Sequence, residues 1–282
     1  MATTKTWTGG ANNNDVSDLA NWNEATAFAD GDTYIFDLTD TTSTKVPTTG
    51  TMTTGAAAIY VTSRSIASIG DGTNFPTFGN GADTQALIQI AGKGALYHFA
   101  IGGSGGATLV DLRGGVGTVR IGGSNPVATL RARGYSLIDL GASVVLTTLF
   151  ATAAPRIVAA ANGTAITTAE LTDGSKLETS RDVTTGVITD STVISKATAK
   201  FATSGTFYGR GRYVKQSSGT EALVKLLSSR SEMTCEGNPN VAATVTALQR
   251  VPGSRLVKAS GACTLAVTET LVGGDDGAAP GE

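Results

Sequence analysis

The chain consists largely of short runs in which apolar and polar residues alternate, each closed by glycine, asparagine or aspartate. Runs at 109–115, 118–123 and 128–134 show the pattern, which recurs about every 7–12 residues from residue 50 to 272. This alternation is typical of half-buried strands. The 36 glycines among 282 residues disfavour helix interiors, whereas the abundant threonine and valine fit pleated strands. The sequence therefore predicts an all-β protein of short strands and tight turns.

Two architectures fit strands of this length and spacing. Sandwiches and barrels need antiparallel hairpins, whose strongest signal is Asn-Gly or Asp-Gly between matched strands. Such pairs are sparse, occurring at 80–81, 162–163 and 173–174. A β-helix instead turns its corners with single glycine, asparagine or aspartate residues and stacks each coil on the one before. We therefore expect a right-handed parallel β-helix, with a β-sandwich as the alternative.

The first 45 residues differ from the rest, because they hold both tryptophans and a polar asparagine run. The end of a solenoid exposes unpaired strand edges and core, so a cap is needed. We expect residues 1–45 to be a capping or anchoring segment, 46–272 the β-helix and 273–282 a flexible tail. The residues expected to cover the first coil or to anchor the chain on a partner are Trp7, Trp22, Tyr34 and Phe36.

The N-terminal segment also carries a resemblance. It contains Trp-Thr-Gly-Gly at 7–10, Asn-Trp at 21–22 and Gly-Asp at 31–32 before an aromatic strand. This opening resembles that of phage and bacterial parallel β-helix structural proteins, and it is most like a phage virion decoration or fibre protein. The resemblance covers about the first 40 residues. It implies an architecture and says nothing of an activity.

Charge and hydropathy exclude several classes of protein. A formal net charge of −2 gives no general reason to bind nucleic acid or an anionic membrane. No window approaches the ~18 apolar residues of a membrane span. The first residues lack the basic and apolar segments of a secretion signal, so we expect synthesis in a cytoplasm. In such a reducing compartment, Cys235 and Cys263 are expected to be free, partly buried thiols.

Residues that could carry chemistry are scattered. His98 is the single histidine and has no implied nucleophile or orienting acid nearby, so we expect neither a catalytic nor a metal site. The glycine-rich stretches at 91–95 and 101–106 lead into predicted strands, which favours tight turns over phosphate-binding loops. Isolated acids such as Asp111, Asp139 and Asp173 are typical of turns. No cofactor is expected.

Arginines give the strongest hint of a binding surface. Arg113, Arg120, Arg131 and Arg133 fall on successive predicted strands, and a second cluster spans residues 207–215. Stacked strands would turn these clusters into a basic, partly aromatic strip. Such a strip suits an acidic partner surface, because arginine binds carboxylates through two parallel hydrogen bonds. The alternative is an ordinary solvated face with local salt bridges.

These observations favour a non-enzymatic structural protein. We expect a capsid decoration (cement) subunit of a tailed bacteriophage, made in the host cytoplasm and located in the virion. We expect a homotrimer that binds the major capsid protein or another virion protein, and neither nucleic acid nor membrane. The expected partner-binding residues are Trp7, Trp22, Tyr34, Phe36, Arg131 and Arg133. Alternatives are a tail spike or fibre component, a carbohydrate-active β-helix enzyme and a surface adhesin.

Overall fold

The computed structural model describes residues 2–153, 155–161, 164–236, 243–258, 263–264 and 268–272. Strands dominate this part of the chain, and its only helices are two 3-10 turns, η1 (Leu19–Asn21) and η2 (Ser43–Lys45). None of its helices has the length and apolar character needed to cross a membrane. The chain divides into two compact units, unit 1 (residues 1–162) and unit 2 (163–282).

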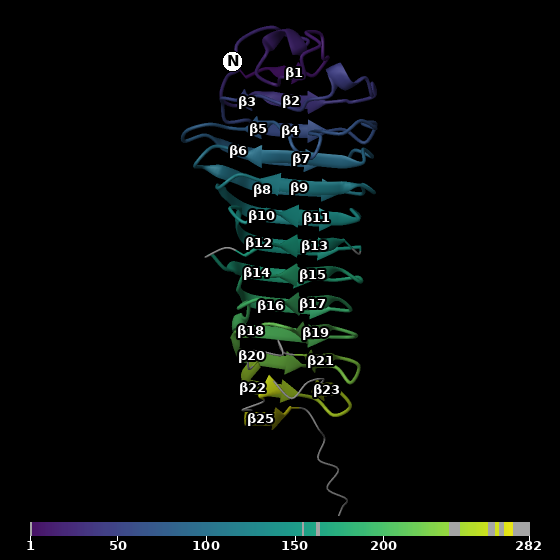
Figure 1. The fold of residues 1–282 in the computed structure, drawn as a ribbon, viewed down its shortest axis with the longest axis vertical. Coiled ribbons are helices and arrows are strands. Elements are labelled where there is room, and N and C mark those ends of the chain that lie inside the picture. Colours follow the sequence, from purple (N-terminus) through teal and green to yellow (C-terminus); the bar gives the residue numbers. More distant parts are fainter. Residues whose placement is uncertain are drawn as a thin grey trace, which may run out of the picture. The chain divides into compact units, whose positions relative to one another are not determined.

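Unit 1 contains two parallel sheets whose strands alternate along the chain (Figure 1). The first sheet has the order β1 (Thr4–Thr6), β2 (Thr33–Phe36), β4 (Ala58–Val61), β6 (Thr84–Ile90), β8 (Gly106–Arg113), β10 (Pro126–Arg133) and β12 (Val145–Thr152). The second has the order β3 (Thr51–Met52), β5 (Thr77–Phe78), β7 (Leu96–Ile101), β9 (Thr118–Gly122), β11 (Leu137–Leu140) and β13 (Arg156–Ala159). Each coil therefore gives one strand to each sheet.

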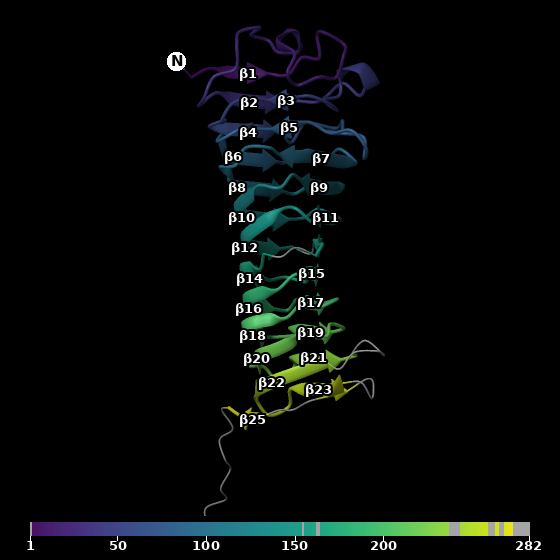
Figure 2. The same cartoon turned by 60° about the vertical axis from the view of Figure 1, so that its left-hand side comes forward.

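Unit 2 follows the same plan, and Figure 2 shows the strands of the first sheet at left and those of the second at right. The first sheet contains β14 (Ile166–Leu171), β16 (Val183–Thr189), β18 (Phe201–Tyr208), β20 (Thr220–Leu226), β22 (Ala243–Arg250), β24 (Cys263–Thr264) and β25 (Thr268–Leu271), the last two both pairing with β22. The second contains β15 (Lys176–Thr179), β17 (Thr192–Ser195), β19 (Arg212–Lys215), β21 (Glu232–Cys235) and β23 (Arg255–Lys258).

Parallel pairing stacks equivalent residues of successive coils on one another. Val110 pairs with Leu130, which pairs with Leu149, and all three side chains are fully buried. Burying an aliphatic side chain of this size stabilises the fold by about 1.5–3 kcal/mol. The expected all-β parallel solenoid is confirmed. The predicted tail, residues 273–282, lies outside the described residues.

A tyrosine ties three coils of unit 1 together. Tyr135 lies between β10 and β11 in the sequence, and its hydroxyl is 3.2 Å from the Ile90 carbonyl oxygen and 3.1 Å from that of Gly92. Its ring crosses the intervening coil at Gly115, where an added Cβ would stand 1.8 Å from a ring carbon. Only glycine leaves room for this crossing.

The N-terminal segment of unit 1 packs around an aromatic cluster. Trp22 is 3% exposed, and its ring centroid lies 5.3–5.9 Å from those of Trp7, Phe28, Tyr34 and Phe36. Its indole Nε1 donates to the Val16 carbonyl oxygen at 3.0 Å. The aromatic residues expected to cover the first coil therefore form one cluster, in which Tyr34 and Phe36 belong to β2 and Trp7 directly follows β1.

One expectation about the cysteines is wrong. Cys235, which is buried in β21, is disulfide-bonded. The expectation of two free thiols rested on a reducing compartment alone. A disulfide was expected only if the fold brought the two cysteines together, and a solenoid places residues of neighbouring coils side by side.

Candidate functional site

The outer face of the second sheet in unit 2 carries one row of mostly charged side chains beside a second row that is mostly uncharged. The alternation along each strand sends every second residue outward, and the parallel register aligns these residues about 4.8 Å apart between coils. The first row consists of Lys176, Thr192, Arg212, Glu232 and Arg255. The second consists of Glu178, Ile194, Val214, Thr234 and Val257.

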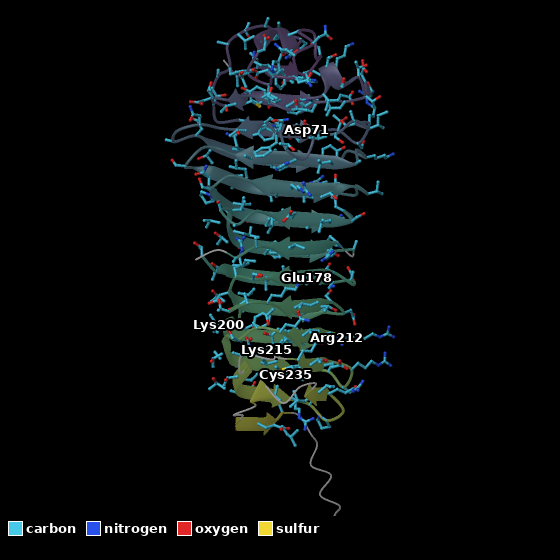
Figure 3. All side chains as sticks on the ribbon, in the orientation of Figure 1. Asp71, Glu178, Lys200, Arg212, Lys215 and Cys235 are labelled. Carbon is cyan, nitrogen blue, oxygen red and sulfur yellow. The ribbon has the colours of Figure 1, made fainter. Side chains whose placement is uncertain are left out.

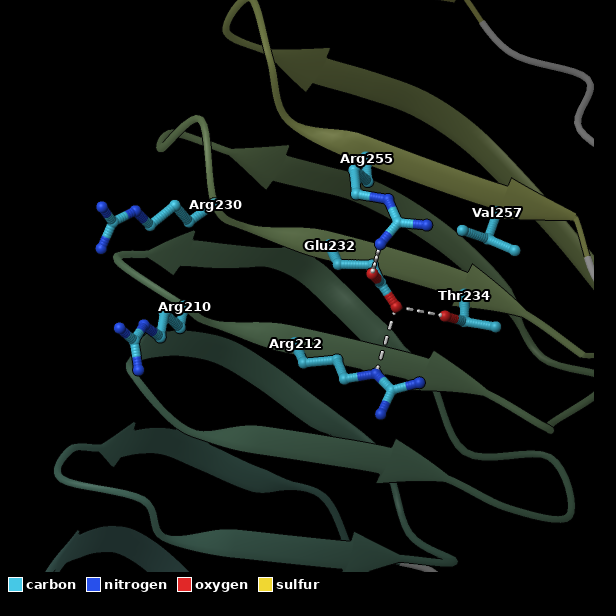
Figure 4. Close-up of a pocket in the computed structure, with 7 residues that line it drawn as sticks. All are labelled: Arg210, Arg212, Arg230, Glu232, Thr234, Arg255 and Val257. Carbon is cyan, nitrogen blue, oxygen red and sulfur yellow. Dashed lines mark hydrogen bonds and ion pairs between the residues drawn. The ribbon is translucent and has the colours of Figure 1, made fainter.

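An open groove lies over the last three coils of this face. It has a volume of about 650 Å³ and is lined by Arg210, Arg212, Arg230, Glu232, Thr234, Arg255 and Val257 (Figure 4). Four arginines and one glutamate give these lining residues a formal charge of +3. The whole chain has a net charge of −2, so the groove is a local concentration of positive charge. We call it the arginine groove.

Glu232 lies at the centre of the arginine groove. Its carboxylate is 3.3 Å from Arg212 Nε on one side and 3.3 Å from Arg255 Nη1 on the other, and Thr234 Oγ1 donates to it at 2.9 Å (Figure 4). The Glu232 side chain is 20% exposed, whereas those of Arg212 and Arg255 are 50% and 71% exposed. One partly covered carboxylate is thus shared by two arginines that remain accessible to solvent.

Arg210 and Arg230 have no acidic partner in the part of the chain that the structure describes, and both are exposed. They occupy equivalent turns, immediately before β19 and β21, and their side chains extend away from these turns (Figure 4). The backbone beneath Arg210 is fixed, because its N–H donates to Asp190 Oδ1 at 2.7 Å and Gly209 supplies a left-handed φ of +57°. The two guanidinium groups are therefore accessible to solvent.

A buried polar network supports β19 from inside the coil. Lys215 Nζ lies 2.8 Å from Glu221 Oε1, and both side chains are fully buried. Tyr213 donates its hydroxyl to the same carboxylate, and Ser195 Oγ lies 2.9 Å from the Tyr213 hydroxyl. Burial raises the pKa of Glu221, although Lys215 opposes the shift. Figure 3 labels Lys215 and Arg212, which occupy the inner and outer faces of one strand.

The predicted arginine strip in unit 1 is only partly formed. Arg131 and Arg133 are exposed on β10, and Arg133 pairs with Arg113 of β8. Arg113 is engaged with Asp111 at 2.6 Å. Arg120 lies on β9 in the other sheet, so the expectation that all four form one strip is wrong. Consecutive strands belong to different sheets, and stacked neighbours are two strands apart.

The second predicted cluster, residues 207–215, contributes two arginines to the groove. Arg210 and Arg212 line it, but Phe207, Tyr213 and Lys215 are fully buried. Tyr208 is 40% exposed but lies on β18 in the other sheet, so no aromatic residue of this cluster lines the groove. Sequence reasoning missed Arg230, Glu232 and Arg255. A recurrence could have revealed two of them, because Arg-Gly-Arg at 210–212 is followed one coil later by Arg-Ser-Glu at 230–232.

The aromatic residues predicted to contact a partner have buried side chains. Trp7 and Trp22 are 5% and 3% exposed, and Tyr34 and Phe36 are fully buried. They are therefore placed to cover the first coil, which was one of their two expected roles. An anchoring contact through them would require the N-terminal segment to open.

The remaining chemical candidates do not converge. The His98 ring stacks on Phe75 with centroids 3.9 Å apart, and burial together with Arg120 lowers its pKa. Among the described residues, no group of three or more histidine, cysteine, aspartate or glutamate side chains is placed to hold a metal ion. Asp111 and Asp139 lie on different sheets of unit 1.

Comparison of the chain with protein-family models, with curated proteins and with solved structures returned no match.

Proposed function

We propose that this chain is a structural, non-catalytic virion protein that docks on an acidic surface of its partner through the arginine groove. The observation that carries the docking role is the groove itself, which is lined by four arginines and a single carboxylate that contacts two of them. Arginine is suited to such contacts, because its guanidinium remains charged and matches the two oxygens of a carboxylate. The parallel coils of unit 2 also provide a rigid support for these arginine side chains.

Within that class we propose a capsid decoration subunit of a tailed bacteriophage. The support is the resemblance of the opening, Trp-Thr-Gly-Gly at 7–10 with Asn-Trp at 21–22, to β-helix structural proteins of phages and bacteria. The partner is then the major capsid protein or another virion protein. A homotrimer matches a threefold position on a capsid lattice, since closed symmetry lets one surface patch serve all three subunits.

Antibody labelling of virions tests whether the protein lies on the capsid. Antibodies raised against the purified chain are applied to virions produced by cells that encode it, and bound antibody is located by electron microscopy. Label over the capsid shell supports the decoration role. Label confined to tails indicates a fibre or spike component, and label confined to the cell envelope indicates an adhesin; either result contradicts the proposal. Native mass spectrometry of the purified chain should give a trimer.

A glycan panel tests the absence of catalysis. The purified chain is incubated with a broad set of polysaccharides, and reducing ends and unsaturated products are measured. We expect no turnover. Robust turnover that disappears in Asp111→Asn, Asp139→Asn or Asp173→Asn, with the fold preserved, would show a carbohydrate-active enzyme, because loss of a catalytic carboxylate lowers rates by orders of magnitude.

A further inference from the structure

Building on the proposed docking through the arginine groove, we infer that the partner presents paired carboxylates on an extended acidic segment, and that Glu232 is a built-in competitor which sets the groove's affinity. The first part concerns the partner's chemistry. The second concerns Glu232, whose replacement should increase the affinity for the partner, whereas replacing a residue that lines a binding groove usually lowers it.

The arginine groove already shows how it holds a carboxylate. Glu232 is contacted from both sides by guanidinium nitrogens at 3.3 Å, and Thr234 donates a third contact at 2.9 Å. Arg212 and Arg255 come from the coils on either side of Glu232, so the site is formed by three stacked strands. A partner carboxylate that entered this row would meet the same donors and would compete with Glu232 for them.

Arg210 and Arg230, which have no acidic partner among the described residues, provide a second position for a carboxylate. Arg210 and Arg230 precede the paired residues Arg212 and Glu232 by two positions each, so they are equivalent residues of neighbouring coils, about 4.8 Å apart along the stack. In an extended peptide, side chains two residues apart lie on one face about 6.5–7 Å from each other. Flexible arginine side chains bridge the difference, so alternating acidic residues suit this pair.

Glu232 opposes such a ligand in two ways. Its negative charge repels an incoming carboxylate, and its contacts with Arg212 and Arg255 occupy donors that the ligand needs. Glu232→Gln removes the charge and keeps an oxygen that accepts from Thr234. Because an exposed ion pair changes affinity by up to about 1 kcal/mol, we expect the dissociation constant to fall about fivefold.

Fluorescence anisotropy with a labelled peptide of alternating glutamate and glycine measures this effect at low and moderate salt. Relative to the unaltered chain, we expect about fivefold tighter binding by Glu232→Gln and at least about tenfold weaker binding by Arg210→Ala/Arg230→Ala. Arg64→Ala/Lys93→Ala in unit 1 is the control, because it removes two exposed positive charges elsewhere, and it should bind within about twofold. Salt should weaken binding by the unaltered chain.

The outcomes separate the two proposals. The proposal of docking through the groove is wrong if the unaltered chain does not bind the peptide at low salt. It is also wrong if Arg210→Ala/Arg230→Ala binds the peptide as tightly as the unaltered chain. If the peptide binds through these arginines but a folded Glu232→Gln binds no more tightly, only the role of Glu232 is wrong. Should that variant not fold, Glu232→Ala provides the same comparison. Tighter binding of heparin or a single-stranded oligonucleotide than of the peptide would contradict the proposal that the partner presents an acidic peptide segment.

Discussion

The N-terminal segment of unit 1 packs around aromatic rings, whereas the interior of unit 2 around β19 combines the rings of Phe201, Phe207 and Tyr213 with a buried lysine, a buried glutamate and two buried serines. In the first region, Trp22 contacts four rings and satisfies its single N–H on the Val16 carbonyl. In the second, Lys215 and Glu221 are fully buried and held by hydrogen bonds. Both interiors belong to parallel coils, so the coil itself does not dictate an apolar core.

The difference shows what each interior contributes. Aromatic packing stabilises in proportion to the apolar area that it removes from water. A buried ion pair gives little net stability, because the cost of removing two charges from water offsets their attraction, but loss of one partner is severe. We therefore interpret the Lys215–Glu221 pair as a device that fixes the position of β19, and with it the arginine groove.

The largest expected loss is at the aromatic cluster. Trp22→Ala should lower the free energy of unfolding by about 4–5 kcal/mol, because it leaves a large cavity and removes the hydrogen bond to Val16. Trp22→Phe is the matched control and should cost clearly less, since a ring still fills the space. Urea denaturation followed by far-ultraviolet circular dichroism measures both. Equal midpoints for Trp22→Ala and the unaltered chain would show that the cluster does not support the fold.

A slightly smaller loss is expected when the buried pair is broken. Lys215→Ala should cost about 3–4 kcal/mol, because it leaves the Glu221 carboxylate buried without its counter-charge. The double variant Lys215→Met/Glu221→Leu should recover most of this loss, as it removes both charges. The same denaturation experiment applies. A double variant as unstable as Lys215→Ala would mean that the pair contributes through packing rather than charge.

Unit 1 and unit 2 each contain a carboxyl group whose shifted pKa makes its contribution to stability depend on pH, and the two dependences run in opposite directions. Asp71 of unit 1 accepts hydrogen bonds from Asn74 and Thr73, which lower its pKa to about 2. A lowered pKa contributes stability above the unfolded value of 3.8, and this is lost as the pH falls toward about 2. Glu221 has a raised pKa because it is buried, so its contribution is present below the unfolded value of 4.5 and is lost as the pH rises through the folded value.

Thermal melting across this pH range, with two variants, measures these contributions. Asp71→Asn should lose less stability than the unaltered chain on acidification from pH 4 to 2. Glu221→Gln should become more stable relative to the unaltered chain as the pH rises above 4.5, because only the unaltered chain then acquires a buried negative charge. A constant difference between Glu221→Gln and the unaltered chain over this range would contradict the raised pKa.

The smallest effect on stability is expected on the outer face of unit 1. Arg131→Glu/Arg133→Glu should change the free energy of unfolding by no more than about 0.5 kcal/mol, because both side chains are exposed. If these arginines contact an acidic virion partner, the same variant should bind virions more weakly, and more visibly at low salt. Unchanged co-sedimentation with virions would remove Arg131 and Arg133 from the set of partner-binding residues.

The sequence was informative where local alternation decides the outcome. It predicted the parallel solenoid, and the same alternation accounts for the buried positions of Leu112, Ile121 and Leu130. It was misleading at Lys215, which was grouped with exposed arginines because of its charge. Strict alternation from Arg212 would have placed Lys215 inside the coil. Which outer residues meet across coils depends on the register between strands, and coil lengths that vary along the chain hide this register from a single sequence.

The crossing of Tyr135 over Gly115 limits how this solenoid can change its length during evolution. Solenoids grow and shrink by gaining or losing whole coils, because each coil contacts only its neighbours. Here the ring reaches past its neighbour to carbonyl oxygens at residues 90 and 92, two coils earlier. Deleting or duplicating a coil between residues 92 and 135 would separate the ring from its glycine or from its acceptors. Lineages derived from this chain should therefore vary in coil number elsewhere, and they should inherit this stretch as a block.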